Sequence, residues 1–462
     1  MAKGSRRLVL GFLFVSLLYA TVLRCNISPV CLWKYRPLWS NSLNLRSKNG
    51  GNTKGIEYFS FLLRRLVRGQ ARRELTQKHM TYISDKESDI CITSSPVRIT
   101  TGSSSSPTVY ITKPNQSQPN QFTLRPYPRK TDSLAMQRTS PVTILINPQS
   151  PLPPCTTIHT SPAVIFSTGG FAGNFFHDIN DVLIPLFLTA GHLHSNVHLV
   201  ITDYEPWWAL KYHRLLSGLS PEIIIASSTS SNVDTAVHCF PAAVVGLKYH
   251  GNLACNSSDV PGGVSIRDFL VFLRDSLELK PMQVHAMQAP VLVLISRRKS
   301  RTLINEDDVV ELARKIGFQV ELATPGRMSK VDEFAELVNS CSVLMGVHGA
   351  GLTNMVFLQP GSVLLQVVPW GLDWASKAYY GGPAEEMGLK YVEHHIVVEE
   401  STLYEEYPKD HPVISDPWSI NLKGYNVSKP VYTDGQNVTL DLMRFREVLL
   451  QAMQLVPRQS LR

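Results

Sequence analysis

The run of residues 343–370 (VLMGVHGAGLTNMVFLQPGSVLLQVVPW) constrains the fold more than any other part of the chain. Its apolar residues predict two buried strands, Val343–Val347 and Val363–Val368, and residues 348–351 predict a glycine-rich turn that leads into a short helix. Glycines allow backbone N–H groups and a helix N-terminus to approach a ligand closely, where their partial positive charge suits a phosphate group. The run therefore predicts a parallel α/β sheet with an anion-binding turn.

A second turn, rich in positive charge, lies upstream, where the predicted strand Val291–Ile295 runs into Arg297, Arg298 and Lys299. In a parallel sheet both turns fall at the carboxyl edge of the strands, where open α/β sheets bind ligands. Arginine can hold a phosphate through two parallel hydrogen bonds. We therefore expect a nucleotide diphosphate between the two turns, and we predict these residues as its binding site: Arg297, Arg298, His348, Gly349, Ala350 and Gly351.

Two alternatives stay open within that prediction. His348 is either a neutral hydrogen-bond donor, because a helix N-terminus disfavours an imidazolium, or simply a packed turn residue. The Arg297–Lys299 run has the plain alternative of a solvated charged surface, but its position directly after a buried strand favours phosphate contact.

An earlier part of the chain repeats the alternation of strands and helices. Ala163–Phe166 reads as a buried strand, a helical run over 175–189 comes next with a kink at Pro185, and further strands are predicted at 197–202 and 223–226. Two such arrays in series predict an α/β protein with two Rossmann-like lobes and a cleft between them.

The turn after Ala163–Phe166 carries the densest polar cluster, NFFHDIND at 174–181. His177 and Asp181 are four residues apart and share one helical face, and a His–Asp pair at a strand-to-helix turn is well placed for general base catalysis. An ordinary exposed helix end with an acidic first turn has the same pattern. We predict His177 and Asp178 as the catalytic residues, one reacting and the other orienting it, and the sequence does not decide which is the base.

An oxidoreductase with a dinucleotide cofactor is the rival interpretation of this turn. Gly169, Gly170 and Gly173 follow a strand, and Asp203 supplies an acid after the next strand, but Thr168 occupies the first glycine position of the G-x-G-x-x-G fingerprint. The incomplete fingerprint disfavours that class.

The N-terminus predicts a membrane anchor. Lys3, Arg6 and Arg7 precede sixteen uncharged residues, Leu8–Leu23. Sixteen residues are short for a membrane span and also fit the core of a cleaved signal peptide, but no small-residue cleavage site follows, and the flanking positive charge predicts a cytosolic N-terminus. The domains predicted from these patterns are a cytosolic tail (1–7), a signal anchor (8–23), a basic stem (24–85), an N-terminal lobe (86–280), and a C-terminal nucleotide-binding lobe with a C-terminal helix (281–455).

The distribution of charge argues against nucleic acid as a partner. The formal net charge is +8, yet residues 1–85 hold fifteen Lys or Arg and three acids, so the remaining chain has more acidic than basic side chains. A nucleic-acid-binding domain would carry the basic excess on its folded part.

The seven cysteines allow disulfides in a luminal protein, and their spacing favours a bridge between Cys239 and Cys255, with Cys91–Cys155 as a weaker pairing and Cys341 as a core thiol. No metal site is predicted, because the chain has no Cys-x-x-Cys and its paired histidines lack ligand spacing. It also contains no Asp-x-Asp, the pair that holds a divalent cation in single-lobe nucleotide-sugar enzymes, so a metal-free scheme is expected.

Several ordered motifs together resemble plant glycosyltransferase family 61, over roughly residues 90–455. They are LRPYPRK (124–130), which also reads as a short strand, FSTGGFAGNFFHDINDVLIPLF (166–187), SRRKSR (296–301), GVHGAGLTN (346–354) and FLQPGSVLLQVVPWG (357–371). The resemblance implies a GT-B fold, an inverting mechanism, no metal requirement and a type II Golgi membrane protein. The chain looks more like the xylan-modifying branch of the family than like the branch that makes the core β-1,2-xylose of N-glycans.

This resemblance implies a pentosyltransferase with UDP-arabinofuranose or UDP-xylose as donor and xylan as acceptor. The Arg297–Arg298 pair and the helix start at Gly349–Gly351 would neutralise the leaving diphosphate, and His177 or Asp178 would deprotonate a xylan hydroxyl. The alternatives are an N-glycan core xylosyltransferase and a non-catalytic glycan-binding subunit of a xylan synthase complex. Donor sugar, attack at O-2 or O-3, and a homo-oligomeric state are left open by the sequence.

Overall fold

The computed structural model describes residues 51–102, 106–112, 119–193, 196–255, 257–258, 260, 262–280 and 289–456. The chain separates into two compact units, Met1–Thr53 and Lys54–Arg462, and the second contains all three β-sheets. No helix within the described ranges has the length and apolarity to cross a membrane. The predicted anchor at 8–23 lies outside those ranges.

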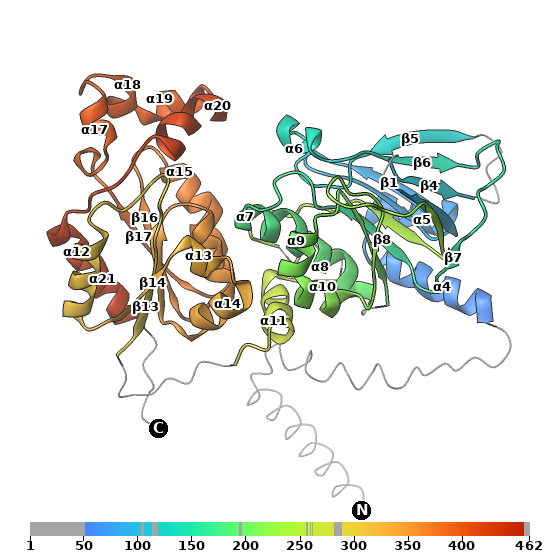
Figure 1. Ribbon diagram of the computed structural model, residues 1–462, viewed down its shortest axis with the longest axis horizontal. Helices are drawn as coiled ribbons and strands as arrows, with labels where there is room; N and C mark the ends of the chain where they lie inside the picture. The colour runs from blue at the N-terminus through green and yellow to red at the C-terminus, as the bar shows by residue number, and fades with distance from the viewer. Residues whose placement is uncertain are drawn as a thin grey trace, which may run out of the picture. The chain divides into compact units, whose positions relative to one another are not determined.

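The C-terminal half of the unit is built on a five-stranded sheet in which every neighbouring pair is parallel. Helices lie on both of its faces (Figure 1), as expected for buried strands rich in Val, Leu and Ile. We call it the C-terminal sheet, and its strands in spatial order are β14 (Gln319–Ala323), β13 (Val291–Ile295), β15 (Val343–Val347), β16 (Val363–Val368) and β17 (Lys390–His395).

In that order the first strand in sequence, β13, has β14 on one side and β15 on the other. The chain therefore reverses its direction of progress across the sheet between β13 and β15. Open α/β sheets bind ligands outside the carboxyl ends of the strands at such a switch point. The turns after β13 and β15 are the two turns for which the sequence predicts phosphate binding.

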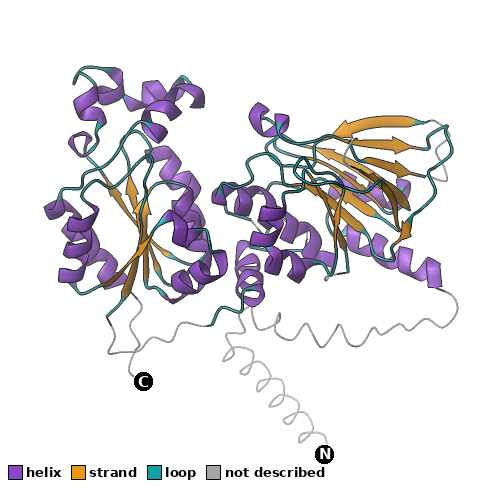
Figure 2. Cartoon of the chain, in the orientation of Figure 1, coloured by secondary structure: helices purple, strands orange, loops and turns teal. Residues whose placement is uncertain are grey.

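Two further sheets of six strands each form the N-terminal half (Figure 2). The first sheet consists, in spatial order, of β1 (Met80–Ser84), β2 (Asp89–Thr93), β12 (Ala243–Val245), β8 (Ala163–Ser167), β9 (His198–Thr202) and β10 (Ile223–Ile225). The second sheet consists of β5 (Asn120–Leu124), β6 (Val142–Ile146), β4 (Thr108–Ile111), β3 (Val97–Thr101), β11 (Ala236–Phe240) and β7 (Thr157–Ile158).

The two N-terminal sheets share one core. Ile99 and Ile144 from the second sheet belong to the same buried cluster as Ile165 and Val200 from the first. The strands β8, β9 and β10 are parallel as predicted, and β12, which is not among the predicted strands, pairs parallel with β8. However, β1 and β2 pair antiparallel, and the second sheet is mixed. A simple Rossmann-like array for this half is therefore wrong, because a sheet packs where that array has helices.

The helices and helical turns of the unit complete the architecture. They are α4 (Gly51–Arg64), α5 (Gly69–Lys78), α6 (Ser133–Gln137), α7 (Phe175–His177), η2 (Asp178–Leu183), α8 (Ile184–Ala190), η3 (Gly191–Leu193), α9 (Pro206–Lys211), α10 (His213–Leu219), α11 (Ile266–Ser276), α12 (Glu306–Ile316), α13 (Pro325–Met328), α14 (Val331–Ser340), η4 (Ala350–Phe357), α15 (Asp373–Ser376), η5 (Lys377–Gly381), α16 (Gly382–Glu386), η6 (Val398–Glu400), α17 (Leu403–Glu406), α18 (Pro412–Ser415), α19 (Pro417–Leu422), α20 (Tyr425–Ser428), η7 (Lys429–Asp434) and α21 (Leu442–Leu455).

The helical run after β8 is divided rather than merely kinked. A π-helical turn, η2, separates α7 from α8 and ends directly before Ile184 and Pro185. Proline has no N–H to donate to the preceding turn, and a widened turn is a common way for a helix to accommodate it. The predicted kink is therefore present, but it begins several residues earlier than Pro185.

The predicted stem (24–85) extends too far along the chain, because its later residues belong to the folded unit. Leu62, Leu63 and Leu75, on α4 and α5, are buried, and β1 pairs along its whole length with β2. The compact unit begins at Lys54, so the part of residues 24–85 that the structure describes belongs mostly to the folded domain. Among its described basic residues, Arg64, Arg72, Arg73 and Lys78 lie on α4 and α5, two helices whose buried leucines pack inward.

The disulfide prediction is also wrong. Cys155 pairs with Cys239, whose Cα atoms are 5.8 Å apart, while Cys255 and Cys91 are buried elsewhere. The bridge joins residues beside β7 and on β11, two strands that pair in parallel. Cys341 is a buried thiol, as predicted, and burial raises its pKa to about 12.

Candidate active site

The polar cluster after β8 forms a His–carboxylate pair. Asn174 caps α7 by accepting a hydrogen bond from the Phe176 N–H, which fixes the start of the helix. One turn later, His177 Nδ1 lies 2.7 Å from Oδ2 of Asp181. The His177 side chain is 18% exposed and the Asp181 side chain is fully buried. The carboxylate therefore holds one ring nitrogen and leaves Nε2 for a substrate.

Asp181 is kept ionised by its surroundings. Its Oδ2 also accepts from the Tyr127 hydroxyl (2.9 Å) and from Arg129 Nε (2.8 Å), and its Oδ1 accepts from Asn180 Nδ2 (2.7 Å). Burial is the largest influence and favours the neutral acid, but His177 and Arg129 together hold the pKa of Asp181 below its ordinary value. An ionised Asp181 stabilises His177 when the ring gains a proton.

Asp178 occupies a different position from its neighbour. It is fully buried, and its Oδ1 accepts from the Gly173 N–H (2.9 Å) and from Trp208 Nε1 (2.9 Å). Its Oδ2 accepts from the Tyr212 hydroxyl (2.7 Å), and Lys211 Nζ lies 3.5 Å away. Both oxygens are taken by donors of the protein, so Asp178 ties the glycine turn and α9 to the π-helical turn.

At the carboxyl edge of the C-terminal sheet, two arginines converge on Gly349. A β-carbon at Gly349 would lie 2.4 Å from Arg297 Nη1 and 3.2 Å from Arg301 Nη1, and the residue has a φ of +149°. Only glycine fits a backbone that passes so close to two guanidinium groups. Arg301 Nη1 donates to the His348 carbonyl (2.8 Å), which ties the turn after β13 to the turn after β15.

These two arginines are largely buried cations without acidic partners. No salt bridge involves Arg297 or Arg301 among the residues that the structure describes, and Arg297 Nε donates only to the Ser300 carbonyl (2.8 Å). Burial, followed by the neighbouring Arg297 charge, lowers the pKa of Arg301 to about 10. Since buried charges are normally paired, this pair is suited to an anionic ligand.

Arg298 is not part of that pair. Its side chain is 55% exposed and lies 3.4 Å from Glu306 Oε1. The sequence predicts phosphate contact for the Arg297–Lys299 run because it follows a strand. In the structure, the turn instead brings Arg301 inward beside Arg297. Arg301 has a φ of +53°, a left-handed conformation that changes the direction of the chain at this residue.

His348 is held in one neutral form. Its Nδ1 accepts from the Gln366 side-chain amide (2.9 Å), whose carbonyl oxygen accepts from the Tyr391 hydroxyl (3.2 Å). With Nδ1 accepting, the proton of the neutral ring resides on Nε2. Burial, and then the charges of Arg301 and Arg297, lower the pKa of His348 to about 3. Of the two alternatives left open by the sequence, an accepting Nδ1 favours the neutral donor, but the burial of the ring agrees equally with a packed turn residue, so the choice stays a prediction.

Gly349 and the next two residues start the helical turn η4, as predicted. Gly349 is its N-cap, and Ala350 is its first residue. A β-carbon at Gly351 would come within 2.9 Å of the Ile295 side chain, so this glycine allows η4 to pack on β13. The turn therefore presents its N–H groups beside the arginine pair.

A chain of aromatic contacts joins the two parts of the site within the unit Lys54–Arg462. The Phe176 ring lies 5.4 Å from that of Tyr379 and 6.4 Å from that of Tyr380. The Tyr380 ring in turn lies 5.3 Å from that of His348. Phe176, the residue next to His177, is thereby in contact with a residue that touches His348, in the glycine-rich turn after β15.

The structure disfavours the rival dinucleotide interpretation, because Asp203, the acid that this interpretation requires, is engaged in other hydrogen bonds. Asp203 Oδ2 accepts from the Ser167 hydroxyl (2.6 Å) and from the Ser140 N–H (3.0 Å), so it secures the end of β8. Gly170 has a φ of +59°, and a β-carbon there would lie 2.5 Å from the Tyr127 ring. Gly170 therefore serves the packing of Tyr127, while a β-carbon at Gly169 would meet the Arg138 carbonyl and one at Gly173 would meet the Trp207 ring.

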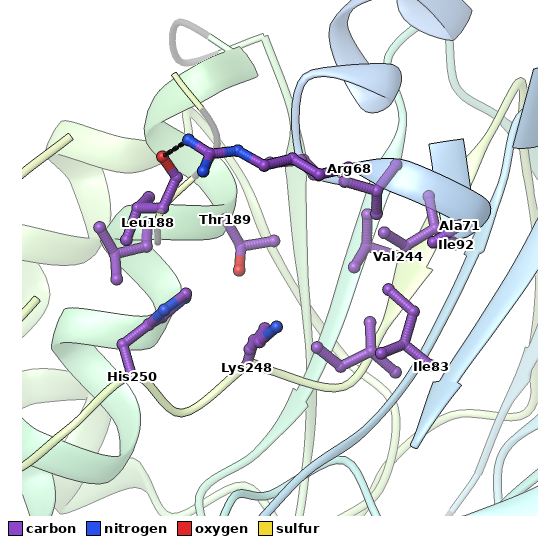
Figure 3. Close-up of a pocket in the computed structure, with 13 residues that line it drawn as sticks. Arg68, Ala71, Ile83, Ile92, Leu188, Thr189, Val244, Lys248 and His250 are labelled. Carbon is purple, nitrogen blue, oxygen red and sulfur yellow. Dashed lines mark hydrogen bonds between the residues drawn. The ribbon is translucent and has the colours of Figure 1, made fainter. Parts of the chain in front are cut away.

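A separate cavity of about 230 Å³ lies beside α5 and the first sheet (Figure 3). Its walls are mainly apolar, with Ile83, Ile92, Leu188 and Val244 among them, and Arg68, Lys248 and His250 add polar groups. It shares no residue with the groups above, and it is smaller than the clefts of roughly 300–1,000 Å³ that hold small-molecule ligands. We do not assign the substrate to it.

The predicted site leaves out four residues that the structure places in it, namely Tyr127, Arg129, Asp181 and Arg301, although the sequence already pairs Asp181 with His177. A signal exists for three of them, since Tyr127 and Arg129 lie in LRPYPRK and Arg301 ends SRRKSR. The prediction of a strand over 124–130 is wrong, because β5 ends at Leu124 and the rest is a loop. Asp181 is recognisable as a partner of His177, but the burial that makes it the orienting carboxylate is not visible in the sequence.

Comparison with known proteins gives a consistent result. The family model described as Glycosyltransferase 61 matches residues 175–365, a segment that includes His177, Arg297, Arg301 and His348. The chain is 39% identical over 383 residues to Alpha-1,3-arabinosyltransferase XAT3 of Oryza sativa subsp. japonica, an alignment that covers 81% of this chain and 65% of the relative.

Two further relatives are similar over comparable lengths. Xylan glycosyltransferase MUCI21 of Arabidopsis thaliana is 38% identical over 403 residues, 82% of this chain and 80% of that protein. Beta-1,2-xylosyltransferase XYXT1 of Oryza sativa subsp. japonica is 36% identical over 340 residues, 72% of each chain. The resemblance to the xylan-modifying branch, inferred from the motifs, is thereby confirmed.

Proposed function

We propose that this chain, which belongs to the glycosyltransferase 61 family, transfers a pentose from a UDP-sugar to xylan. The names of its relatives include an arabinosyltransferase, a xylosyltransferase and a xylan glycosyltransferase. The single observation that carries the chemistry is the buried pair of arginines at Gly349, which lacks acidic partners among the described residues and suits a diphosphate.

In the proposed donor site, Arg297 and Arg301 bind the two phosphates of UDP from the turn after β13. In this proposal the N–H groups at the start of η4 and Nε2–H of neutral His348 donate to the same phosphates from the turn after β15. Negative charge on the diphosphate grows as the sugar leaves, so donors fixed in a partly buried site stabilise the transition state more than the ground state. Two guanidinium groups and a helix start supply the charge that a divalent cation supplies elsewhere, and we propose that no metal is needed.

The proposed base is His177 rather than Asp178. Nε2 of His177 removes the proton of a xylan hydroxyl, the oxygen attacks C1 of the pentose, and the bond between C1 and the diphosphate breaks on the opposite face. The proton remains on His177, and UDP leaves with the electron pair. Asp181 orients the ring and offsets its new charge. Asp178, whose oxygens are occupied by four donors, positions the turn.

We further propose a GT-B arrangement, with the N-terminal sheets and the C-terminal sheet as its two lobes and the substrates bound between them. The support is the switch point of the C-terminal sheet and the contacts of Phe176 with Tyr379 and Tyr380. We retain the expectation of a type II Golgi membrane protein, anchored by residues 8–23.

The test is a transfer assay with the full chain, expressed in a secretory host. A shortened chain that begins at residue 86 is unsuitable, because it lacks α5 and loses β1 from the first sheet. Xylo-oligosaccharides are incubated with UDP-arabinofuranose or UDP-xylose in the presence of EDTA, and products are identified by mass spectrometry and NMR.

A pentose adduct with one donor supports the proposal, names the donor and gives the acceptor oxygen. A product only on N-glycan acceptors would assign the chain to the N-glycan xylosyltransferase branch instead. If the folded protein binds UDP and xylan but forms no product with either donor, the non-catalytic subunit is the better account.

A further inference from the structure

Three histidines and one glutamate gather at the amino edge of the parallel strands in the N-terminal half. His198 begins β9, Glu222 directly precedes β10, His159 follows β7, and His238 lies in the middle of β11. The rings of His159 and His198 are 4.4 Å apart, and His159 Nε2 lies 3.0 Å from His238 Nδ1. His198 Nδ1 lies 3.1 Å from Glu222 Oε2.

The spacing of these groups is near that of a metal shell, though wider. One ligand atom each from His159, His198 and Glu222 can be chosen so that all lie within 4.8 Å of one another. Ligand atoms bound to one zinc ion at about 2.0–2.2 Å lie roughly 3.2–3.6 Å apart. The Glu222 side chain is 55% exposed, so its carboxylate can close the remaining distance without disturbing the core.

The chemistry of the donor set agrees with a first-row transition metal. Imidazole nitrogens with one carboxylate suit zinc, copper or nickel, whereas calcium and magnesium prefer oxygen. Burial, the largest influence in each case, places the pKa of His159, His198 and His238 below the ordinary histidine value, so the rings favour the neutral form that binds metals.

We propose that His159, His198 and Glu222 bind a divalent transition metal, with zinc as the ion to test, and that His238 completes the shell or holds His159 in place. His198 and Glu222 belong to the first sheet, while His159 and His238 belong to the second, so a bound ion ties the two sheets together. The site adjoins Cys239, whose bridge to Cys155 strengthens the same edge of the second sheet.

The position assigns the ion a structural role. His198 and Glu222 lie at the amino ends of β9 and β10, whereas the candidate base follows the carboxyl end of β8. In a parallel arrangement these are opposite edges of the first sheet. The inference does not rest on the proposed transferase activity, and an ion at this edge is consistent with a metal-free reaction.

The test measures metal binding without donor or acceptor. The full-length protein is stripped with a chelator, dialysed against zinc and then against zinc-free buffer, and analysed for bound zinc and melting temperature. The variants are His198→Ala and Glu222→Gln, the latter at an exposed side chain that does not endanger folding. His213→Ala, which removes an exposed histidine of α10 from the same half of the chain, is the matched control.

We expect about one zinc per chain in the wild type and in His213→Ala, with a melting temperature that falls on chelation. In His198→Ala and Glu222→Gln we expect zinc affinity to fall by roughly tenfold or more, and chelation to have little further effect on melting. No stoichiometric zinc in the wild type, or unchanged zinc affinity in Glu222→Gln, would overturn the proposal. Failure of the transfer assay leaves this result unaffected, since neither substrate is present.

Discussion

Nδ1 of His177 lies 2.7 Å from Oδ2 of Asp181, and the same carboxylate oxygen is shared with the Tyr127 hydroxyl and Arg129 Nε. The aspartate is thus held by other donors as well as by the histidine. A ring held through Nδ1 directs Nε2 outward in one orientation, which is the arrangement that a general base requires. This relationship is the basis for the first two predictions.

Substitution of His177 by Gln is expected to lower the rate of pentose transfer by about 10²- to 10⁴-fold, the usual contribution of a positioned general base. UDP affinity should remain within a small factor, because His177 is not among the groups that converge on Gly349. Initial rates and UDP titration by calorimetry measure the two quantities separately. Unchanged transfer in this variant would remove His177 from the mechanism.

Substitution of Asp178 by Asn is expected to act on stability. The change leaves one amide nitrogen facing buried donors such as Trp208 Nε1 and the Tyr212 hydroxyl, at a cost of about 1–3 kcal/mol in the free energy of unfolding. Denaturant unfolding gives that value, and transfer is assayed well below the melting temperature. If Asp178→Asn keeps wild-type stability and loses transfer as His177→Gln does, then Asp178 is the base and our assignment is reversed.

Arg301 and Arg298 provide a matched pair for the donor site. Arg301→Lys should weaken UDP binding by about 10- to 100-fold, since charge-assisted hydrogen bonds contribute roughly 1.5–3 kcal/mol. Arg298→Lys should have little effect, because Arg298 is exposed and lies beside Glu306. Calorimetric titration with UDP in EDTA compares them, and equal losses in both variants would contradict the assigned pair.

Gly349→Ala tests the same site through the backbone. The new β-carbon would lie 2.4 Å from Arg297 Nη1, at a φ that side chains rarely adopt. Arg297 has to move, so UDP affinity should fall without any change in charge. Gly326→Ala is the control, as nothing lies within 4 Å of a β-carbon there. If Gly349→Ala keeps full UDP affinity, the close passage of the Gly349 backbone beside Arg297 is not needed for UDP binding.

Protonation of His348 is expected to account for part of the pH dependence of the free energy of unfolding. Its pKa is about 3 in the folded protein and about 6.5 when unfolded, so below pH 6.5 the unfolded state binds a proton that the folded state does not. Its contribution to stability is therefore present above pH 6.5 and is lost as the pH falls toward 3. His348→Gln should show a shallower loss of unfolding free energy over this range. A slope equal to that of the wild type would mean that His348 titrates normally.

Three of the five strands of the C-terminal sheet can be predicted residue by residue, whereas β17 is not among the predicted strands. Val291–Ile295, Val343–Val347 and Val363–Val368 are strands with the predicted bounds. These segments are short apolar runs between clear turn and cap signals, and their pairing is parallel, so local sequence decides them. The positions of His348 and Gly349 at the carboxyl edge result from the same pattern.

The N-terminal half is harder to predict because its order is set by long-range pairing. β12 inserts between β2 and β8, and Cys155 meets Cys239 through strands that are far apart in sequence. The histidine cluster has the same origin, since His159, His198 and His238 come from three separate segments with no local ligand spacing. The inward direction of Arg301 depends on a left-handed backbone conformation that the motif does not reveal.

The most direct test of the account is the coupled measurement of UDP release and pentose transfer to xylo-oligosaccharides by the full chain in EDTA, with His177→Gln alongside. We expect one UDP released for each pentose added, inverted configuration at C1 by NMR, and a loss of both signals in His177→Gln. Transfer that requires an added divalent cation, or that retains the configuration at C1, would contradict the arginine-based, single-displacement mechanism.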